Sequence, residues 1–457
     1  MIKVAKFGGS SLASAEQIKK VANIIKNDPD IRGVVLSAPG KRNDSDTKVT
    51  DLLIKLFKEY SNSSDSYINT MDKIIERYRQ IAYVLGLASD FIETYKIELN
   101  QMLQDIDDDL YLENALKSCG EDFNARLVAR YLNSLGLKSR YVSPKEAGIE
   151  LDYVLNEPVI SDRTYENIKK LRDIDELIVM PGFYGVNKQG KILTFLRGGS
   201  DISGAILSRG LGCDIYENYT DMSYIYSAHP KMIESPKPIR NITYAEIREL
   251  SYNGFEIFQE DAVEPLLNQN IKICVKNTNK PYEGGTIIEQ DRSDVGLNPV
   301  VGISNVGKFI SFNITEYLMN RKVGYINKLL DIFEYQHIPV EHIPTGIDSL
   351  SILIRKEHIK SESEMQSLKN AIDDNFAYNK FNIKDNLASI AIVGEGLTND
   401  MTRALYLISK SLNEENIKIE FIIQGASNNS LFLFVDEKDE KLATEKLYSY
   451  FMWKLTL

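Results

Sequence analysis

Two glycine pairs that lie far apart in the sequence have charged neighbours suited to binding an anion. The first is in KFGGSS at residues 6–11, and the second is in LRGGSD at 196–201. A glycine pair lets backbone N–H groups approach a ligand without a Cβ in the way, and a lysine beside them is a point charge suited to phosphate. Glycine pairs after strands are also common turns. Taken alone, each stretch therefore permits two interpretations, a phosphate site or a tight turn.

Two further stretches combine polar side chains that could bind a ligand. CGEDFNARLVARYL at 119–132 places Glu121 at the predicted start of a helix, where its charge would suit the helix dipole. NYTDMSYIYSAHPK at 218–231 combines hydroxyl groups with an acid and a Pro-Lys end. Each again has an ordinary structural interpretation, as a helix start or a polar loop.

Two other glycine-rich stretches resemble nucleotide-binding motifs but lack a required residue. GISNVGKF at 302–309 matches part of a P-loop, yet Phe309 stands where that motif needs a hydroxyl group for magnesium. GEGLTND at 394–400 lacks the third glycine of a dinucleotide fingerprint. We interpret the first as a chance match and the second as a turn from a strand into a helix.

The composition indicates a globular protein without general affinity for nucleic acid. The 457 residues suggest two to four domains, and the formal charge of −11 does not supply the basic face that nucleic acid requires. The three cysteines lack CxxC spacing, which fits a reducing compartment and predicts neither disulfides nor a metal site. No apolar run approaches the roughly 18 residues of a membrane span, and the opening is too short for a signal peptide. We therefore expect a cytoplasmic protein with neither membrane nor nucleic-acid partners.

The first 295 residues alternate strand-like and helix-like patterns, as α/β domains do. The strand predicted for IKVAKF at 2–7 precedes a helix whose capping box pairs Ser14 with Gln17. RGVVLSAP, ELIVMPGF and KILTFL predict later strands. Residues 66–116 are predicted to form a helical insertion, because apolar residues recur there at helical spacing: Ile74, Tyr78, Ile81 and Leu85.

An internal repeat begins at about residue 300. HIPVEHIPTGIDSLSILI and NIKIEFIIQGASNNSLFLFV superpose at one offset, which aligns Ile338 with Ile417 and Ser351 with Ser430. In each copy the predicted order is strand–helix–strand–strand–helix–strand, which is the ferredoxin-like unit. Two tandem copies suggest a paired regulatory module, and a pair that only drives oligomerisation is the alternative. A strand at 300–306 that pairs with the second copy would interleave the two.

The ordered set of motifs resembles the aspartokinases of the amino-acid kinase superfamily over nearly the whole chain. It comprises KFGGSSLA, LSAPGKRNDSDTKVTDLL, GED, VMPGFYG, TFLRGGSDISGA and YTDMSYIYSAHPK. The resemblance implies an αβα sandwich with a mainly parallel sheet in a kinase domain over 1–295. It further implies two ferredoxin-like ACT domains, over 300–385 and 386–457.

By this resemblance, the reaction transfers a phosphoryl group from ATP with Mg²⁺ to the side-chain carboxylate of L-aspartate. The product would be 4-phospho-L-aspartate, at the first step towards lysine, threonine and methionine. Phosphoryl transfer needs positioning and neutralisation of charge more than covalent help. Lys6 would neutralise the transferred group and Asp201 would orient Lys6. The resemblance implies phosphate contacts from the backbone at Gly8, Gly9, Ser10, Gly199 and Ser200.

The resemblance also implies binding residues for both substrates. Glu121 would bind the amino group of aspartate and Arg197 a carboxylate, with help from Ser37 and Thr50. The nucleotide would contact Thr220, Asp221, Tyr226, Pro230 and Lys231. His229, Lys231 and Glu256 depart from the residues usual in the family, and Glu256 replaces a lysine, which places nucleotide affinity in question.

For the regulatory half, the resemblance implies an amino-acid effector held by the helix start at Gly324, Tyr325 and Ile326. Val340 and Glu341 would lie on the following strand, and the acid favours L-lysine over L-threonine as the effector. A solvated charge at a strand edge is the alternative for Glu341. Subunits of the family pair through ACT domains, which implies a homodimer or a dimer of dimers. Two other functions stay open, a sister enzyme acting on another small acid and a non-catalytic amino-acid sensor.

Overall fold

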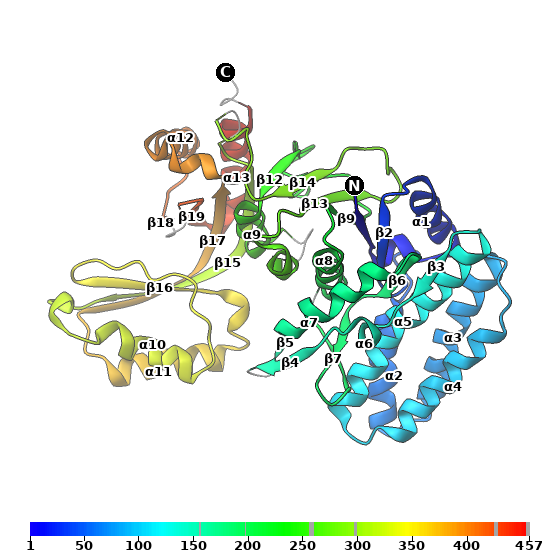
Figure 1. Cartoon of the computed structure of the whole chain (residues 1–457). Helices are drawn as coiled ribbons and strands as arrows, with labels where there is room; N and C mark the ends of the chain where they lie inside the picture. The colour runs from blue at the N-terminus through cyan, green and yellow to red at the C-terminus, as the bar shows by residue number, and fades with distance from the viewer. Residues whose placement is uncertain (155–156, 197, 256–259, 297–298, 425–427, 454–457) are drawn as a thin grey trace. The chain divides into compact units, whose positions relative to one another are not determined.

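The structure is a computed structural model of the chain, and it describes all residues except 155–156, 197, 256–259, 297–298, 425–427 and 454–457. The chain forms two compact units (Figure 1). The first comprises Met1–Ile225, Pro238–Ile247 and Glu256–Arg292, and the second comprises Tyr226–Lys237, Arg248–Phe255 and Ser293–Leu457.

Among the described residues, no helix combines the length and apolar character needed to cross a bilayer. The three cysteines are free and buried.

The first unit is built on an eight-stranded sheet in the order β12-β14-β13-β9-β1-β2-β6-β3. Within the described residues, its strand pairs are parallel except for β13 with β14, which confirms the mainly parallel sheet expected from the sequence. The strands are β1 (Lys3–Phe7), β2 (Ile31–Leu36), β3 (Ser139–Tyr141), β6 (Leu177–Pro181), β9 (Ile215–Thr220), β12 (Asn241–Thr243), β13 (Lys272–Asn277) and β14 (Thr286–Glu289).

The alternation of side chains along β1 decides which layer each residue faces. Ala5 and Phe7 pack in the core formed with α1 (Ala15–Asn27) and the helices of residues 49–134. Lys6 points to the opposite face, which α8 (Gly199–Leu211) covers. Gly33 of β2 lies on that face too, where a Cβ would stand 2.9 Å from Leu207 of α8. The central strand thus delivers one charged side chain, Lys6, to the α8 layer.

The helical insertion is longer than the sequence analysis predicted. It comprises α2 (Val49–Ser61), α3 (Ser66–Val84), α4 (Asp90–Asp105) and α5 (Asp109–Ser134), visible in blue and cyan in Figure 1. The predicted apolar stripe is buried as expected: Ile74, Tyr78, Ile81 and Leu85. The prediction that Glu121 starts a helix was wrong, because α5 begins twelve residues earlier at Asp109 and continues through Gly120.

Shorter elements connect these layers. Three two-stranded sheets pair β4 (Leu151–Val154) with β5 (Glu157–Ile160), β7 (Tyr184–Val186) with β8 (Ile192–Thr194), and β10 (Ile225–Tyr226) with β11 (Pro238–Ile239). The described residues also form the short α-helices α6 (Pro144–Ala147), α7 (Asp162–Asn167) and α9 (Tyr244–Tyr252). The strand predicted for KILTFL is therefore β8, which lies outside the main sheet.

The second unit contains one antiparallel sheet in the order β16-β15-β17-β19-β18. The strands are β15 (Gly302–Thr315), β16 (Ser349–Arg355), β17 (Lys380–Val393), β18 (Phe421–Gln424) and β19 (Ser430–Asp436), and the helices are α10 (Tyr325–Tyr335), α11 (Glu362–Asn375), α12 (Met401–Asn413) and α13 (Glu440–Tyr448). The long strands β15 and β17 run through both copies of the repeat. Gly302 pairs with Val393, and Val300 and Ile303 pack in the core of the second copy, which confirms the predicted interleaving.

The first copy departs from the predicted strand order. The segment at 338–345 forms only isolated bridges, from His342 to Leu353 and from Thr345 to Leu350, where a strand was expected. Pro339 and Pro344 explain the difference, because proline has no N–H group to donate to a sheet. The corresponding segment of the second copy has no proline, and it forms β18.

Candidate active site

The Lys6 side chain forms an ion pair with Asp201 inside the first unit. Nζ of Lys6 and Oδ1 of Asp201, in the first turn of α8, are 2.6 Å apart. Asn218 lies opposite Lys6 in the β1–β9 register, and its Nδ2 donates to the same Oδ1 at 2.7 Å. Lys6 in turn donates to Oδ1 of Asn218 at 3.3 Å. Asp201 and Asn218 hold the ammonium group of Lys6 in one place, in a region where solvent screens its charge weakly.

The two glycine pairs meet at this ion pair. Gly8 follows β1 directly, and a 3-10 turn begins at Gly9. Gly198, with φ of +61°, adopts the left-handed conformation that favours glycine, and α8 starts at the next residue. Backbone N–H groups at such a helix start and loop bind phosphate groups. The structure thus brings together the two stretches that the sequence analysis proposed as a phosphate site, although their function stays a prediction.

The loop after β2 (residues 37–48) lies against the predicted phosphate loop (residues 8–13). The Gly40 N–H group donates to the Gly9 carbonyl oxygen at 2.9 Å, and a Cβ on Gly40 would stand 2.6 Å from the Gly9 carbonyl carbon. Only glycine at position 40 allows this approach without displacing the backbone. Ser37, at the start of the same loop, donates its N–H to the Phe7 carbonyl at the end of β1. The predicted substrate residue Ser37 is therefore adjacent to the predicted phosphate residues.

Glu121 is a buried carboxyl group with spare hydrogen-bonding capacity. Glu121 stands in the middle of α5. Its Oε2 is buried without a hydrogen-bond partner among the described residues. Burial raises the pKa of Glu121 to about 8, and a hydrogen bond with the backbone of Ala38 opposes this only partly. A buried polar atom is normally paired, so this carboxyl group suits a ligand that supplies an N–H donor.

The surroundings of Glu121 include a residue that the sequence analysis did not name. Asn124 donates from Nδ2 to the Ser37 carbonyl at 2.7 Å, and its Oδ1 is also buried and unpaired within the described structure. A Cβ on Gly120 would lie 2.8 Å from Cβ of Ala38 and 3.8 Å from Oγ1 of Thr50. The predicted residues Ser37, Thr50 and Glu121 therefore gather around the contact between α5 and the loop after β2. Asn124 follows Glu121 by about one helical turn, and this spacing could have indicated from the sequence that the two side chains share one face of the helix.

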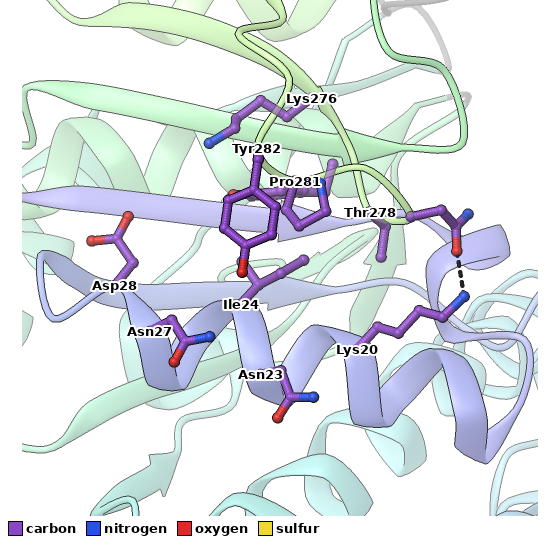
Figure 2. A pocket seen from close by; sticks show the side chains of 11 residues that line it. Lys20, Asn23, Ile24, Asn27, Asp28, Lys276, Thr278, Pro281 and Tyr282 are labelled. Atoms are coloured by element: carbon purple, nitrogen blue, oxygen red, sulfur yellow. Dashed lines mark hydrogen bonds between the residues drawn. The ribbon is translucent and has the colours of Figure 1, made fainter.

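A cavity of about 440 Å³ lies elsewhere in the first unit, between α1 and the residues after β13 (Figure 2). Its lining residues are Lys20, Asn23, Ile24, Asn27, Asp28, Tyr219, Lys276, Thr278, Asn279, Pro281 and Tyr282. The predicted catalytic and substrate residues are not part of this lining. A hydrogen bond of 2.6 Å between the hydroxyl groups of Thr278 and Ser11 connects the cavity wall to the phosphate loop.

Comparison with known proteins places this site in a family. Residues 1–277 match the model of the amino acid kinase family. The chain is 40% identical to aspartokinase 3 of Bacillus subtilis over 455 residues, with 98% of each chain covered. The chain belongs to the aspartokinase family. It is therefore an enzyme, a kinase.

Solved structures agree with this assignment for the fold. A crystal structure of aspartate kinase from Clostridium acetobutylicum matches with a TM-score of 0.88 and 32% identity, covering 98% of this chain and 100% of that one. Structures of Escherichia coli aspartokinase III match with TM-scores of 0.75 at 20% identity, one with aspartate and ADP and one with lysine and aspartate. These two Escherichia coli structures cover 99% and 98% of this chain, and the matches cover 100% and 99% of the Escherichia coli chains.

The predicted nucleotide residues of this aspartokinase are divided between the two units. Thr220 ends β9 and Asp221 follows it in the first unit, where Nδ2 of Asn277 donates to the Asp221 carbonyl at 2.9 Å. The others belong to the second unit: Tyr226, Pro230 and Lys231. There the Lys231 N–H group donates to Nδ1 of His229 at 3.1 Å. Arg197 and Glu256 lie outside the described residues.

The predicted effector residues lie in the first copy of the repeat. Gly324, with φ of +78°, precedes α10, Tyr325 is buried and Ile326 is 38% exposed at its start. Val340 is half-buried. The alternative of a solvated Glu341 was wrong, because Nε of Arg355 contacts one carboxylate oxygen at 2.9 Å and the Tyr252 hydroxyl donates to the other at 2.6 Å. The Glu341 carboxylate is thus paired with a cation and a hydroxyl group.

Proposed function

We propose that this aspartokinase transfers the γ-phosphoryl group of ATP to the side-chain carboxylate of L-aspartate, giving 4-phospho-L-aspartate and ADP. The observation that supports the reaction most directly is the ion pair of Lys6 with Asp201 where the two glycine pairs meet. Mg²⁺ would enter with the nucleotide, because it binds mainly to substrate phosphates and keeps much of its water. This reaction opens the route to lysine, threonine and methionine, and we place the enzyme in the cytoplasm with the other ATP-dependent steps of biosynthesis.

The nucleophile in this reaction needs no general base. A substrate side-chain carboxylate has a pKa near 4 and is already ionised at neutral pH. One carboxylate oxygen attacks the γ-phosphorus while the bond to the β,γ-bridging oxygen breaks, and ADP leaves with the electron pair. The enzyme must then neutralise charge and align the two anions. Lys6 supplies the positive charge, and Asp201 with Asn218 fixes its position.

Recognition of aspartate is proposed for the pocket at Glu121. The ammonium group of the substrate would donate to the unpaired oxygens of Glu121 and Asn124, which are buried and lack other donors within the described residues. Ser37 and Thr50 would contact a carboxylate, together with Arg197, which lies outside the described residues. Glutamate, longer by one methylene, would place its carboxylate away from the phosphate loop. Initial rates of ADP release with L-aspartate, L-glutamate and no acceptor test this choice of substrate.

For the nucleotide, we propose contacts from Thr220, Asp221, Tyr226, Pro230 and Lys231. The hydroxyl of Thr220 lies 3.1 Å from Oδ1 of Asp221 at the carboxyl end of β9. Ligands of parallel sheets bind at this end of the strands.

A sensor that has lost turnover is the alternative function, motivated by His229 and Glu256, and it predicts amino-acid binding without ADP release.

For regulation, we propose feedback inhibition by L-lysine bound at Gly324, Tyr325, Ile326, Val340 and Glu341. The kinase domain would span 1–295 and the two ACT domains 300–385 and 386–457, with assembly into a homodimer or a dimer of dimers through the latter. The paired and largely buried acid Glu341 supports a basic effector, since it could exchange its contact with Arg355 for one with the ligand ammonium.

Glu341→Gln should raise the L-lysine concentration for half-inhibition about tenfold, the effect of losing roughly 1.4 kcal/mol from a charged hydrogen bond. The uninhibited kcat should stay within about twofold, because Glu341 contacts no residue of the catalytic pair. Steady-state rates over a lysine titration measure both quantities. Glu357→Gln, at an exposed position of the same unit, is the matched control. L-lysine should inhibit this variant at the same concentration as the wild type. Unchanged inhibition in Glu341→Gln would contradict the proposed effector site.

A further inference from the structure

Arg77 is a buried cation on the apolar side of α3. Its side chain is 6% exposed, and it lies between the core residues Ile74, Tyr78 and Ile81. Burying a guanidinium group is unfavourable unless its N–H groups are paired. Nε of Arg77 is buried without a partner among the described residues, so the contacts of Nη1 and Nη2 must stabilise the buried cation.

The guanidinium group of Arg77 binds the backbone of two loops at once. Nη2 donates to the Ala13 carbonyl at 3.0 Å and to the Gly40 carbonyl at 2.8 Å. Ala13 ends the phosphate loop, and Gly40 belongs to the loop after β2. The Gly40 N–H group donates to the Gly9 carbonyl, so Gly40 is held through both its N–H group and its carbonyl. One rigid fork thus links the two backbone segments that would hold ATP and aspartate.

Asp46 orients this fork. Nη1 of Arg77 is 2.7 Å from Oδ2 of Asp46, and Arg42 contacts both oxygens of the same carboxylate, with Nε at 2.8 Å and Nη2 at 2.9 Å. The Arg42 guanidinium, and secondly Arg77, hold the pKa of Asp46 well below its usual range. The Asp46 carboxylate thus joins the guanidinium groups of Arg42 and Arg77, and it connects α3 to the loop after β2.

We propose that Arg77 is a positioning residue that sets the spacing between the phosphate loop (residues 8–13) and the loop after β2 (residues 37–48), and so aligns the aspartate carboxylate with the γ-phosphorus. The inference rests on the proposed function, because the alignment matters only if both substrates bind at these loops. A lysine cannot replace Arg77, since its single ammonium group cannot reach two carbonyls and a carboxylate in the geometry of a planar fork.

The experiment compares Arg77→Lys with Arg79→Lys in the full-length chain. Arg79 lies on the same helix, is 40% exposed and contacts Glu76 and Glu93 at the surface. Steady-state kinetics with varied ATP and varied L-aspartate give kcat and both KM values, and thermal unfolding gives Tm. For Arg77→Lys we expect kcat to fall about 10²-fold, the effect of a misplacement of about 1 Å, with each KM changed less than about threefold. Arg79→Lys should match the wild type.

A merely structural Arg77 would lower Tm and the fraction of active enzyme while the kcat of the folded molecules stayed unchanged. Folded Arg77→Lys with kcat within about twofold of the wild type would overturn the inference. If Arg77→Lys does not fold, Asp46→Asn replaces it, with Arg77 kept and its anchor weakened, and an unchanged kcat in that variant would be equally decisive. A wild type without aspartate-dependent turnover would instead contradict the proposed function, so the two failures are distinguishable.

Discussion

Lys6→Ala should lower kcat about 10³-fold, the effect seen when a positioned positive charge or donor is removed from a phosphoryl or acyl transition state. The ammonium group of Lys6 is held 2.6 Å from Asp201, at a largely buried position. It therefore interacts with the developing charge without first reorganising. Initial rates of ADP release with saturating ATP and L-aspartate measure the effect.

The same substitution should leave the fold intact. Asp201 keeps the hydrogen bond from Nδ2 of Asn218 when Lys6 is removed, so its carboxylate is not left without a donor. Lys19→Ala, on the exposed face of α1, is the matched control and should retain kcat within about twofold. A folded Lys6→Ala enzyme with kcat within tenfold of the wild type would remove Lys6 from the proposed mechanism.

Glu121→Gln should raise KM for L-aspartate about 10²-fold, with a smaller effect on KM for ATP. The proposed contact joins the substrate ammonium to a buried carboxylate, and loss of one partner of such a buried pair commonly costs about 2–5 kcal/mol. Glutamine keeps the size of the side chain, so packing in α5 is preserved. Glu166→Gln, exposed in the same unit, controls for the substitution itself. An unchanged KM for aspartate in Glu121→Gln would contradict the proposed pocket.

The raised pKa of Glu121 makes its effect on stability depend on pH. Folding raises this pKa from 4.5 to about 8, chiefly through burial. The stabilisation from keeping Glu121 protonated is complete below about pH 4.5 and is lost as the pH rises towards 8. Because glutamine does not ionise, Glu121→Gln should gain stability relative to the wild type across this interval. Chemical unfolding at pH 5 and pH 8 tests the sign, and an equal difference at both values would contradict the raised pKa.

Most of the candidate site could be predicted from sequence, because it depends on local backbone chemistry. Glycine pairs after strands, a lysine on β1 and an acid in the first turn of α8 are visible without a structure. Asn218 was not identified, since its contact with Asp201 depends on the register between β1 and β9. Arg77 and Asn124 were missed for the same kind of reason. Their carbonyl partners come from loops remote in sequence.

Two errors have a common cause in the interpretation of glycine and proline. Gly120 was taken to precede a helix start, whereas the structure uses it inside α5 to let the helix approach Ala38. The apolar pattern at 338–345 indicated a strand, but Pro339 and Pro344 restrict it to isolated bridges. In both segments the tertiary context decided the backbone.

The central claim is that the chain phosphorylates the side-chain carboxylate of L-aspartate. Its most direct test is trapping of the acyl phosphate as a hydroxamate, with purified enzyme, ATP, Mg²⁺, L-aspartate and hydroxylamine. We predict hydroxamate formation that requires both ATP and L-aspartate, that equals ADP release, and that Lys6→Ala abolishes within the range of the assay. Absence of hydroxamate from a folded protein that L-lysine still stabilises against heat would contradict the kinase and indicate an amino-acid sensor.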